Sequence, residues 1–340
     1  MNRNSILTLA VSLLIIAAVA CGTASPTATP DTQATIGVAI AATSTAQAGV
    51  QATIDAAVQA TSTALPTRTP SAEYVTMTEE ELAALIDQAV AEATAATQEC
   101  STTTTETTAD GTVTQEEADA LETYVTDAEE AIAYAEELIY AYYDLYGELA
   151  TETITLLQAI EEDLTVLAED IATVNAMLQE INTALEQGLA VAEESITQLE
   201  ATAQAASTRA AEIQPQAQSW LQDLQAELES RAATALSIQP DNIPADRQAA
   251  LQAAFDYVDG VRQALDDDRI SQAELADIAQ LGANASAGLN AHGGSQLQRL
   301  SGSINDITGQ IARGQMPQAR ANVGNLEASL GTRPSRPSRP

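Results

Sequence analysis

Apolar residues recur three and four positions apart over most of the chain beyond residue 76, which is the spacing of amphipathic α-helices. Three segments carry the same start signal: a Thr or Ser, a Glu three residues later, and an apolar residue directly before the pair. In this arrangement the hydroxyl and the Glu carboxylate accept hydrogen bonds from backbone N–H groups at the start of the helix. The apolar residue before them packs against the first turn of the same helix. The pattern therefore predicts helices that begin in MTEEEL (77–82), VTQEEA (113–118) and ISQAEL (270–275).

The longest uninterrupted helical pattern starts at Thr114, because no proline follows until Pro215. Gly147 and Gly188 are its weak points, and each can mark a kink or a turn, since glycine costs about 1 kcal/mol relative to alanine inside a helix. A heptad seam with few flanking charges runs through the second half of this segment, and its breadth favours a bundle or folded-back hairpin over a two-stranded coiled coil. The seam consists of Leu164, Leu167, Ile171, Val174, Leu178, Ile181 and Leu185, then, after a four-residue stutter, Leu189, Ala192, Ile196, Leu199, Ala203, Ala206, Ala210 and Ile213.

The last third of the chain also has a helical pattern. Breaks rich in Gly, Pro and polar residues separate four periodic runs, and such breaks join short helices into hairpins. The runs cover residues 245–265, 271–286, 296–312 and 318–330. We therefore expect an all-α fold in which a long coiled-coil or helical-bundle segment is followed by short helical hairpins.

The chain begins with an apolar run over residues 6–20, which is too short to span a membrane, since about 20 apolar residues are needed to cross ~30 Å of hydrocarbon. Its length is that of the apolar core of a signal peptide. The run ends in Ala18-Val19-Ala20-Cys21, which resembles the lipobox of bacterial lipoproteins, with Ala18 where Leu is usual. The resemblance implies that the thiol of Cys21 carries a lipid and that Cys21 becomes the new N-terminus. The alternative is an ordinary signal cleavage after Ala20.

Residues 22–72 are mainly Ala, Thr, Pro, Ser and Gln, with too few large apolar side chains to offset the entropy cost of folding. We expect this stretch to be a disordered tether. The predicted parts are then a signal peptide (1–20), a lipid-anchored disordered linker (21–72), a short helix with a Ser/Thr-rich loop (73–113), an acidic coiled-coil or bundle segment (114–236), a C-terminal helical module (237–331) and a basic Arg/Pro tail (332–340).

The chain is strongly acidic, with 48 Asp and Glu residues against 13 basic residues, all of them Arg. Because phosphate backbones repel such a balance, we exclude nucleic acid as a partner of the main body. No basic residue lies between Arg68 and Arg209, whereas the tail carries Arg333, Arg336 and Arg339. One hypothesis is that the tail docks on the acidic region of its own chain or of a neighbour. The alternative is a disordered basic end, since exposed ion pairs contribute only ~0 to 1 kcal/mol each.

No motif points to catalysis or to a cofactor. The stretch DGTVTQEEADAL (110–121) is similar to the second half of an EF-hand loop, but Glu106 and Thr108 stand where the first calcium ligands are expected. His292 lies beside two glycines with no Cys or His nearby in the sequence, so we assign it no role. We therefore predict no catalytic, cofactor or metal site, and no enzyme.

Two features leave alternatives open. If Cys21 is lipidated, Cys100 has no intramolecular partner, and it is either a surface thiol or the site of an intermolecular disulfide. A group of tyrosines either fills a helical interface or forms a patch that binds sugar or peptide; its place on an amphipathic helix favours the interface. The group comprises Tyr134, Tyr140, Tyr142, Tyr143 and Tyr146.

The predicted architecture favours a structural protein over an enzyme. We expect an exported protein that is anchored to a cell-envelope membrane through lipid on Cys21 and acts as a spacer or scaffold, with self-association through the coiled coil. The alternative is a surface binding protein whose module at 237–331 captures a peptide, a wall polymer or another envelope protein.

Overall fold

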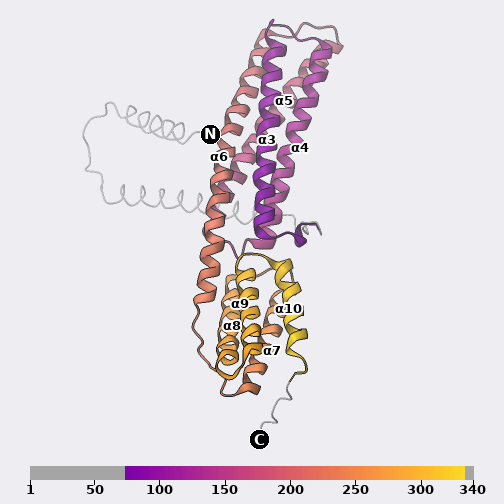
Figure 1. Cartoon of the computed structure of the whole chain (residues 1–340). Coiled ribbons are helices and arrows are strands. Elements are labelled where there is room, and N and C mark those ends of the chain that lie inside the picture. Colours follow the sequence, from indigo (N-terminus) through magenta and orange to yellow (C-terminus); the bar gives the residue numbers. More distant parts are fainter. Residues whose placement is uncertain (1–72, 334–340) are drawn as a thin grey trace, which may run out of the picture. The chain divides into compact units, whose positions relative to one another are not determined.

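The computed structural model describes residues 73–333, which belong to one compact unit, and all regular structure in this part is helical (Figure 1). The all-α prediction is confirmed. The predicted signal peptide, Cys21, the linker and the tail arginines Arg336 and Arg339 lie outside the described residues. The elements are a 3₁₀ turn η1 (Tyr74–Thr76) and the helices α3 (Glu79–Thr108), α4 (Gln115–Tyr146), α5 (Ile154–Glu186), α6 (Glu193–Ser237), α7 (Arg247–Ala264), α8 (Gln272–His292), α9 (Ser295–Ala312) and α10 (Met316–Leu330).

The three helix starts predicted from the capping signal are all present. Thr78, Thr114 and Ser271 are the N-caps of α3, α4 and α8, and each side chain accepts a hydrogen bond from the backbone N–H of the Glu three residues later. The Glu side chain in turn accepts from the backbone N–H of the N-cap residue in each case. Each box satisfies donors that the first helical turn would otherwise leave unpaired.

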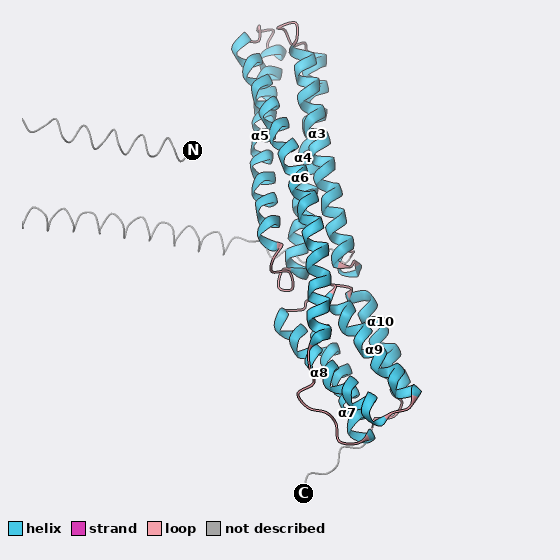
Figure 2. Ribbon diagram, turned by 60° about the vertical axis from the view of Figure 1, so that its left-hand side comes forward, coloured by secondary structure: helices cyan, strands magenta, loops and turns pink. Residues whose placement is uncertain are grey.

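Helices α3, α4, α5 and α6 pack into a four-helix bundle (Figures 1 and 2). Gly147 ends α4, and Gly188, with φ +68°, lies in the turn between α5 and α6, so both weak points are turns. The predicted stutter is this second turn, where Leu189 is 56% exposed. Away from this turn, the seam residues from Leu164 to Ile181 and from Ile196 to Ile213 are buried, where α5 packs on α4 and α6 and α6 packs on α3. Leu185 beside the turn is only partly buried, and Ala192 is exposed. The apolar seam is therefore covered within a single chain.

The segment predicted as a short helix followed by a Ser/Thr-rich loop is instead the 30-residue helix α3, so the prediction for 73–113 was wrong. The threonine hydroxyls are satisfied inside the helix: those of Thr97, Thr104 and Thr108 donate to the carbonyl four residues earlier at 2.8, 2.8 and 2.9 Å. The hydroxyl of Thr94 donates to the carbonyl of Ala210 on α6 at 3.1 Å. With these partners the tract can be buried, and the bundle begins at α3 rather than at residue 114.

Helix α6 is 45 residues long and contains Pro215 in its interior. At 1.5 Å per residue it extends for about 68 Å. Proline removes one helical hydrogen bond at a cost of about 3 kcal/mol. Ile213, Ala217 and Trp220 are buried on both sides of it, and their packing holds the helix through this position. The second half of α6 thus leaves the bundle as a continuation of the same helix.

Each of the four predicted C-terminal runs contains one helix, α7 to α10, although α8 continues to His292, past the predicted end at 286. The helices pack in sequence, α7 on α8, α8 on α9 and α9 on α10. The C-terminal half of α6 packs on α9, and more loosely on α8, so this one helix belongs to both groups (Figure 2).

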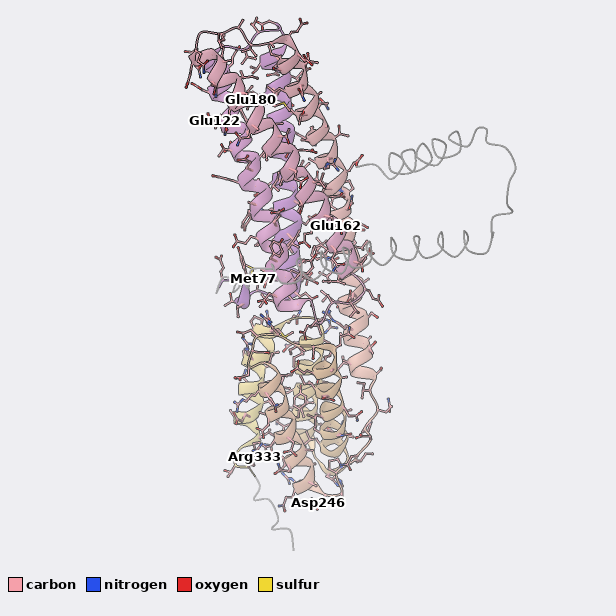
Figure 3. The ribbon with its side chains drawn as sticks, turned by 180° about the vertical axis from the view of Figure 1, so that it is seen from behind. Met77, Glu122, Glu162, Glu180, Asp246 and Arg333 are labelled. Atoms are coloured by element: carbon pink, nitrogen blue, oxygen red, sulfur yellow. The ribbon has the colours of Figure 1, made fainter. Side chains whose placement is uncertain are left out.

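Glu122 and Glu180 lie toward one end of the bundle, whereas Asp246 and Arg333 lie at the far end of the C-terminal helices (Figure 3). None of the helices in the described part combines the length and the low charge needed to cross a membrane.

Candidate functional site

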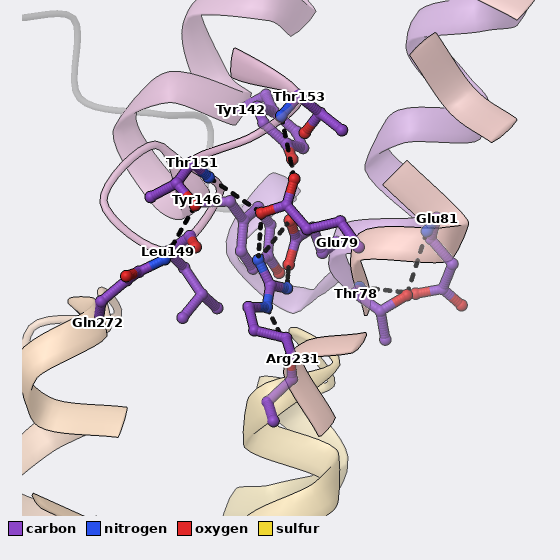
Figure 4. Close-up of polar contacts among 12 residues, drawn as sticks. Thr78, Glu79, Glu81, Tyr142, Tyr146, Leu149, Thr151, Thr153, Arg231 and Gln272 are labelled. Carbon is purple, nitrogen blue, oxygen red and sulfur yellow. Dashed lines mark hydrogen bonds and ion pairs between the residues drawn. The ribbon is translucent and has the colours of Figure 1, made fainter. Parts of the chain in front are cut away.

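A buried cluster of charged side chains lies where the bundle meets the C-terminal helices (Figure 4). It consists of Glu79 at the start of α3 and of Glu227 and Arg231 one turn apart on α6, with exposed fractions of 0%, 6% and 9%. Charges that are withdrawn from water to this extent are costly unless they are paired and hydrogen-bonded. The partners of each group therefore determine whether the junction is stable.

Arg231 joins three elements. Its guanidinium is paired with both carboxylate oxygens of Glu79, and its Nε donates to the carbonyl of Ala312 at 2.7 Å. This carbonyl is the last of α9, one of the groups that a helix leaves without an internal partner. A second nitrogen of Arg231 lies 3.6 Å from Oε1 of Glu227. One side chain of α6 thus connects the bundle to the end of α9.

Glu79 has neutral partners in addition to Arg231. The hydroxyl of Tyr142 donates to its Oε1 at 2.8 Å, and its own backbone N–H donates to the carbonyl of Gly314 at 3.1 Å. Gly314 has φ +65°, and a Cβ at this position would overlap the Glu79 side chain, so both the backbone conformation and the lack of space favour glycine here. Burial raises the pKa of Glu79 above its ordinary value, and the nearby Arg231 only partly opposes this.

Glu227 caps a helix from a distance. Its two carboxylate oxygens accept from the backbone N–H groups of Thr151 at 2.9 Å and Thr153 at 3.0 Å. Thr153 is the N-cap of α5, but its own side chain makes no capping bond. A carboxylate at this position accepts from N–H groups that have no partner within the helix, and it interacts favourably with the positive end of the helix dipole. The start of α5 is thereby held by a residue 74 positions further along the chain.

The tyrosines of α4 support this cluster. Tyr142 is buried edge-on against Trp220, with ring centroids 5.4 Å apart, and the hydroxyl of Tyr146 donates to the carbonyl of Met77 at 2.7 Å. Burial also raises the pKa of Tyr142 well above its usual range, so its hydroxyl is a stable donor to Glu79. With Tyr143 partly buried, these three residues fill a helical interface, as expected, while Tyr134 and Tyr140 are 38% and 37% exposed.

Further contacts surround the cluster at the junction. The side-chain amide of Gln272 on α8 donates to the carbonyl of Leu149 at 3.2 Å and to the hydroxyl of Thr151 at 3.1 Å. Exposed ion pairs join the same parts of the chain, and such pairs contribute only ~0 to 1 kcal/mol each. They are Arg269 with Asp144, and Arg313 with Glu229.

A cavity of about 350 Å³ opens beside the charged cluster, between the α4–α5 connection, α6 and α8. Its polar end includes Thr151, Glu227 and Arg231, and its apolar end is formed by Ile238, Leu275 and Ala279. The cavity lies where α6 and α8 make few contacts with each other. Its volume is at the lower end of the range of small-molecule sites, roughly 300–1,000 Å³.

The side chains of the stretch that is similar to an EF-hand loop (110–121) form local hydrogen bonds. Glu117 accepts from the backbone N–H and the hydroxyl of Thr114, and Asp110 accepts from the backbone N–H and the hydroxyl of Thr112. Within residues 73–333, no three side chains of His, Cys, Asp or Glu gather closely enough to hold a metal ion. His292 ends α8, and its Nε2 lies 2.7 Å from the carbonyl oxygen of Pro244 in the α6–α7 connection.

Two expectations for single residues are corrected. Cys100 is fully buried inside α3, and burial raises the pKa of its thiol to about 11, so it is neither a surface thiol nor accessible for a disulfide between folded chains. Arg333 pairs with Asp259 on α7 and lies over the ring of Phe255, 5.1 Å from its centroid. For this residue of the tail, the contact is with the C-terminal helices rather than with the acidic segment 114–236.

The fold and the junction define a class of all-helical protein in which one long helix is shared by two helical groups and a buried ion cluster joins them. Comparisons with family models, with curated proteins and with solved structures gave no match to this chain.

Proposed function

We propose that the chain is an exported lipoprotein that acts as a spacer or scaffold at the cell envelope, with lipid on Cys21, a linker at 22–72, and a rigid helical unit that extends away from the membrane. The observation that carries the proposal is the sharing of α6 (Glu193–Ser237) between the bundle and the C-terminal helices. A spacer needs a fixed distance between its ends, and a continuous helix packed on both sides provides one.

The junction supports the same proposal. If the two groups of helices were joined only by α6, a bend near residue 230 would change the position of the distal end. Arg231 holds α6 to α3 through Glu79 and to α9 through the carbonyl of Ala312. These bonds oppose such a bend because breaking them leaves buried polar groups without partners.

The charge of the chain opposes the self-association that the coiled-coil pattern led us to expect, so the proposal is a spacer that acts as single copies. A chain with a formal net charge of −35 repels its own copies and other anionic surfaces at distances up to the Debye length, ~8 Å at physiological salt. The proposal assigns no reaction to the chain and no nucleic-acid partner.

The experiment that tests the proposed anchor compares two single cysteine variants in cells. Cys21→Ser is expected to abolish labelling by a fatty-acid probe and to move the protein from the membrane fraction to the soluble fraction. Cys100→Ser is the matched control, because Cys100 is buried in α3, and it should leave labelling and partitioning unchanged. Unchanged membrane partitioning and mass of Cys21→Ser would contradict the proposal.

A second function is favoured by one observation, the cavity beside Glu227 and Arg231. A surface binding protein needs a recess with a few polar groups on an apolar wall, and this cavity has both.

A further inference from the structure

The cavity at the junction has two chemically different ends. Its polar end, at the start of α5 and on α6, includes Glu227 and Arg231, and both side chains are at least nine-tenths buried. Its apolar end is lined by Ile238, Leu275 and Ala279. Such a recess suits a small molecule with one polar head and a short aliphatic body.

The charges at the polar end favour a cation. The buried cluster contains two carboxylates, Glu79 and Glu227, against the single guanidinium of Arg231. Glu227 lines the cavity, Glu79 lies behind Arg231 outside the lining, and the exposed Glu152 adds a second carboxylate to the cavity wall. Arg231 is already paired with both oxygens of Glu79, so its charge is largely neutralised within the protein. A buried excess of negative charge is stabilised either by a proton or by a cation in the cavity.

The hydrogen-bonding groups at this end also suit a donor. An ionised carboxylate offers about four acceptor positions. Glu227 uses one on each oxygen for the backbone N–H groups of Thr151 and Thr153, and Arg231 lies 3.6 Å from its Oε1, so Oε2 keeps a free position. Gln272 donates both of its hydrogen bonds through Nε2, so its carbonyl oxygen can accept another. An ammonium group has three N–H donors and no acceptor, and it matches this set of oxygen atoms.

We propose that the cavity beside Glu227 binds a small aliphatic amine, with its ammonium group at Glu227 and its alkyl chain against the wall formed by Ile238, Leu275 and Ala279. This inference does not depend on the lipid anchor or on the spacer function. It assigns the chain a ligand class that an inert spacer would lack.

The test is calorimetric titration of the purified full chain with n-butylammonium, and with 1-butanol and butyrate as probes of similar size and different charge. We expect saturable binding of n-butylammonium with one site per chain, and at least tenfold weaker binding of butanol and butyrate. Equal or tighter binding of butyrate would overturn the proposal, because the guanidinium of Arg231 would then determine the ligand. Absence of saturable n-butylammonium binding would overturn it as well.

Two pairs of variants locate the site. Ala276 is exposed and lines the cavity, whereas Ala273 is exposed on the same helix outside the lining. Ala276→Leu should weaken n-butylammonium binding at least tenfold, and Ala273→Leu should change it less than twofold. Glu227→Gln should weaken binding at least tenfold, and Glu229→Gln, two residues away and outside the lining, should not. If loss of the α5 cap unfolds Glu227→Gln, the alanine pair alone decides: equal binding by both alanine variants would refute the assignment.

Discussion

Replacement of Arg231 by methionine removes the one positive charge of the buried cluster while keeping a side chain of similar length. Glu79, which is fully buried, and Glu227 are then left together without their counter-ion. Removal of one partner of a buried ion pair typically costs 3–5 kcal/mol, and loss of the bond to the carbonyl of Ala312 adds an unpaired buried acceptor. We therefore expect Arg231→Met to lower the free energy of unfolding by about 4 kcal/mol at pH 7.5.

The cost should depend on pH, because Glu79 can escape its uncompensated charge by taking up a proton. Burial already raises its pKa in the intact protein, and loss of Arg231 removes the main opposing effect. If the folded state requires Glu79 to be protonated, each pH unit above the pKa of this group costs about 1.4 kcal/mol of stability. The destabilisation by Arg231→Met should therefore be smaller at pH 5 than at pH 7.5.

Urea unfolding provides the assay, followed by circular dichroism at 222 nm and by the fluorescence of Trp220. This residue is the only tryptophan of the chain, and it is buried against Tyr142 beside the cluster. Arg247→Met is the matched control at an exposed position, and it should change stability by less than about 0.5 kcal/mol. A cost below 1 kcal/mol for Arg231→Met at both pH values would show that the buried carboxylates do not depend on Arg231.

Three further predictions concern single groups. Because the pKa of Glu79 is raised in the folded state, protonation of this residue contributes stability that is fully present below its ordinary pKa of 4.5 and is lost as the pH rises through the folded-state value. In unfolding measurements from pH 5 to 8, the free energy of unfolding should therefore fall less steeply with pH for Glu79→Gln than for the parent. Cys100 should resist alkylation at pH 8 until the protein is unfolded, and rapid modification of the native Cys21→Ser chain would contradict its burial. Gly188→Ala, at φ +68°, should destabilise the protein by about 1 kcal/mol, whereas Gly324→Ala inside α10 should not; equal thermal shifts of the two variants would contradict this.

The features that the sequence predicts well are those encoded by neighbouring residues. The capping boxes at Thr78, Thr114 and Ser271 each depend on two side chains three positions apart, and all three are present. The glycines that divide the long pattern also act locally, since Gly188 adopts a left-handed conformation that other residues rarely take.

The features that the sequence does not reveal depend on distant partners. Glu79 has the pattern of an acid in the first turn of a helix, and only the packed structure shows that Arg231, 152 positions later, neutralises it. The Thr-rich end of α3 has low intrinsic helix propensity, and the bundle buries it only because the threonine hydroxyls find carbonyl partners. Cys100 is buried because it lies on the face of α3 that packs into the bundle.

A distance measurement across the junction can show whether the bundle and the C-terminal helices form one rigid unit. Spin labels at Glu122 on α4 and Asn325 on α10, both exposed, report this distance after Cys21 and Cys100 are replaced by serine. A pair at Glu122 and Gln204, within the bundle, serves as the reference for label motion. We expect a single distance distribution across the junction that is about as narrow as that of the reference pair. A broad or bimodal distribution across the junction, together with a narrow reference, would contradict it.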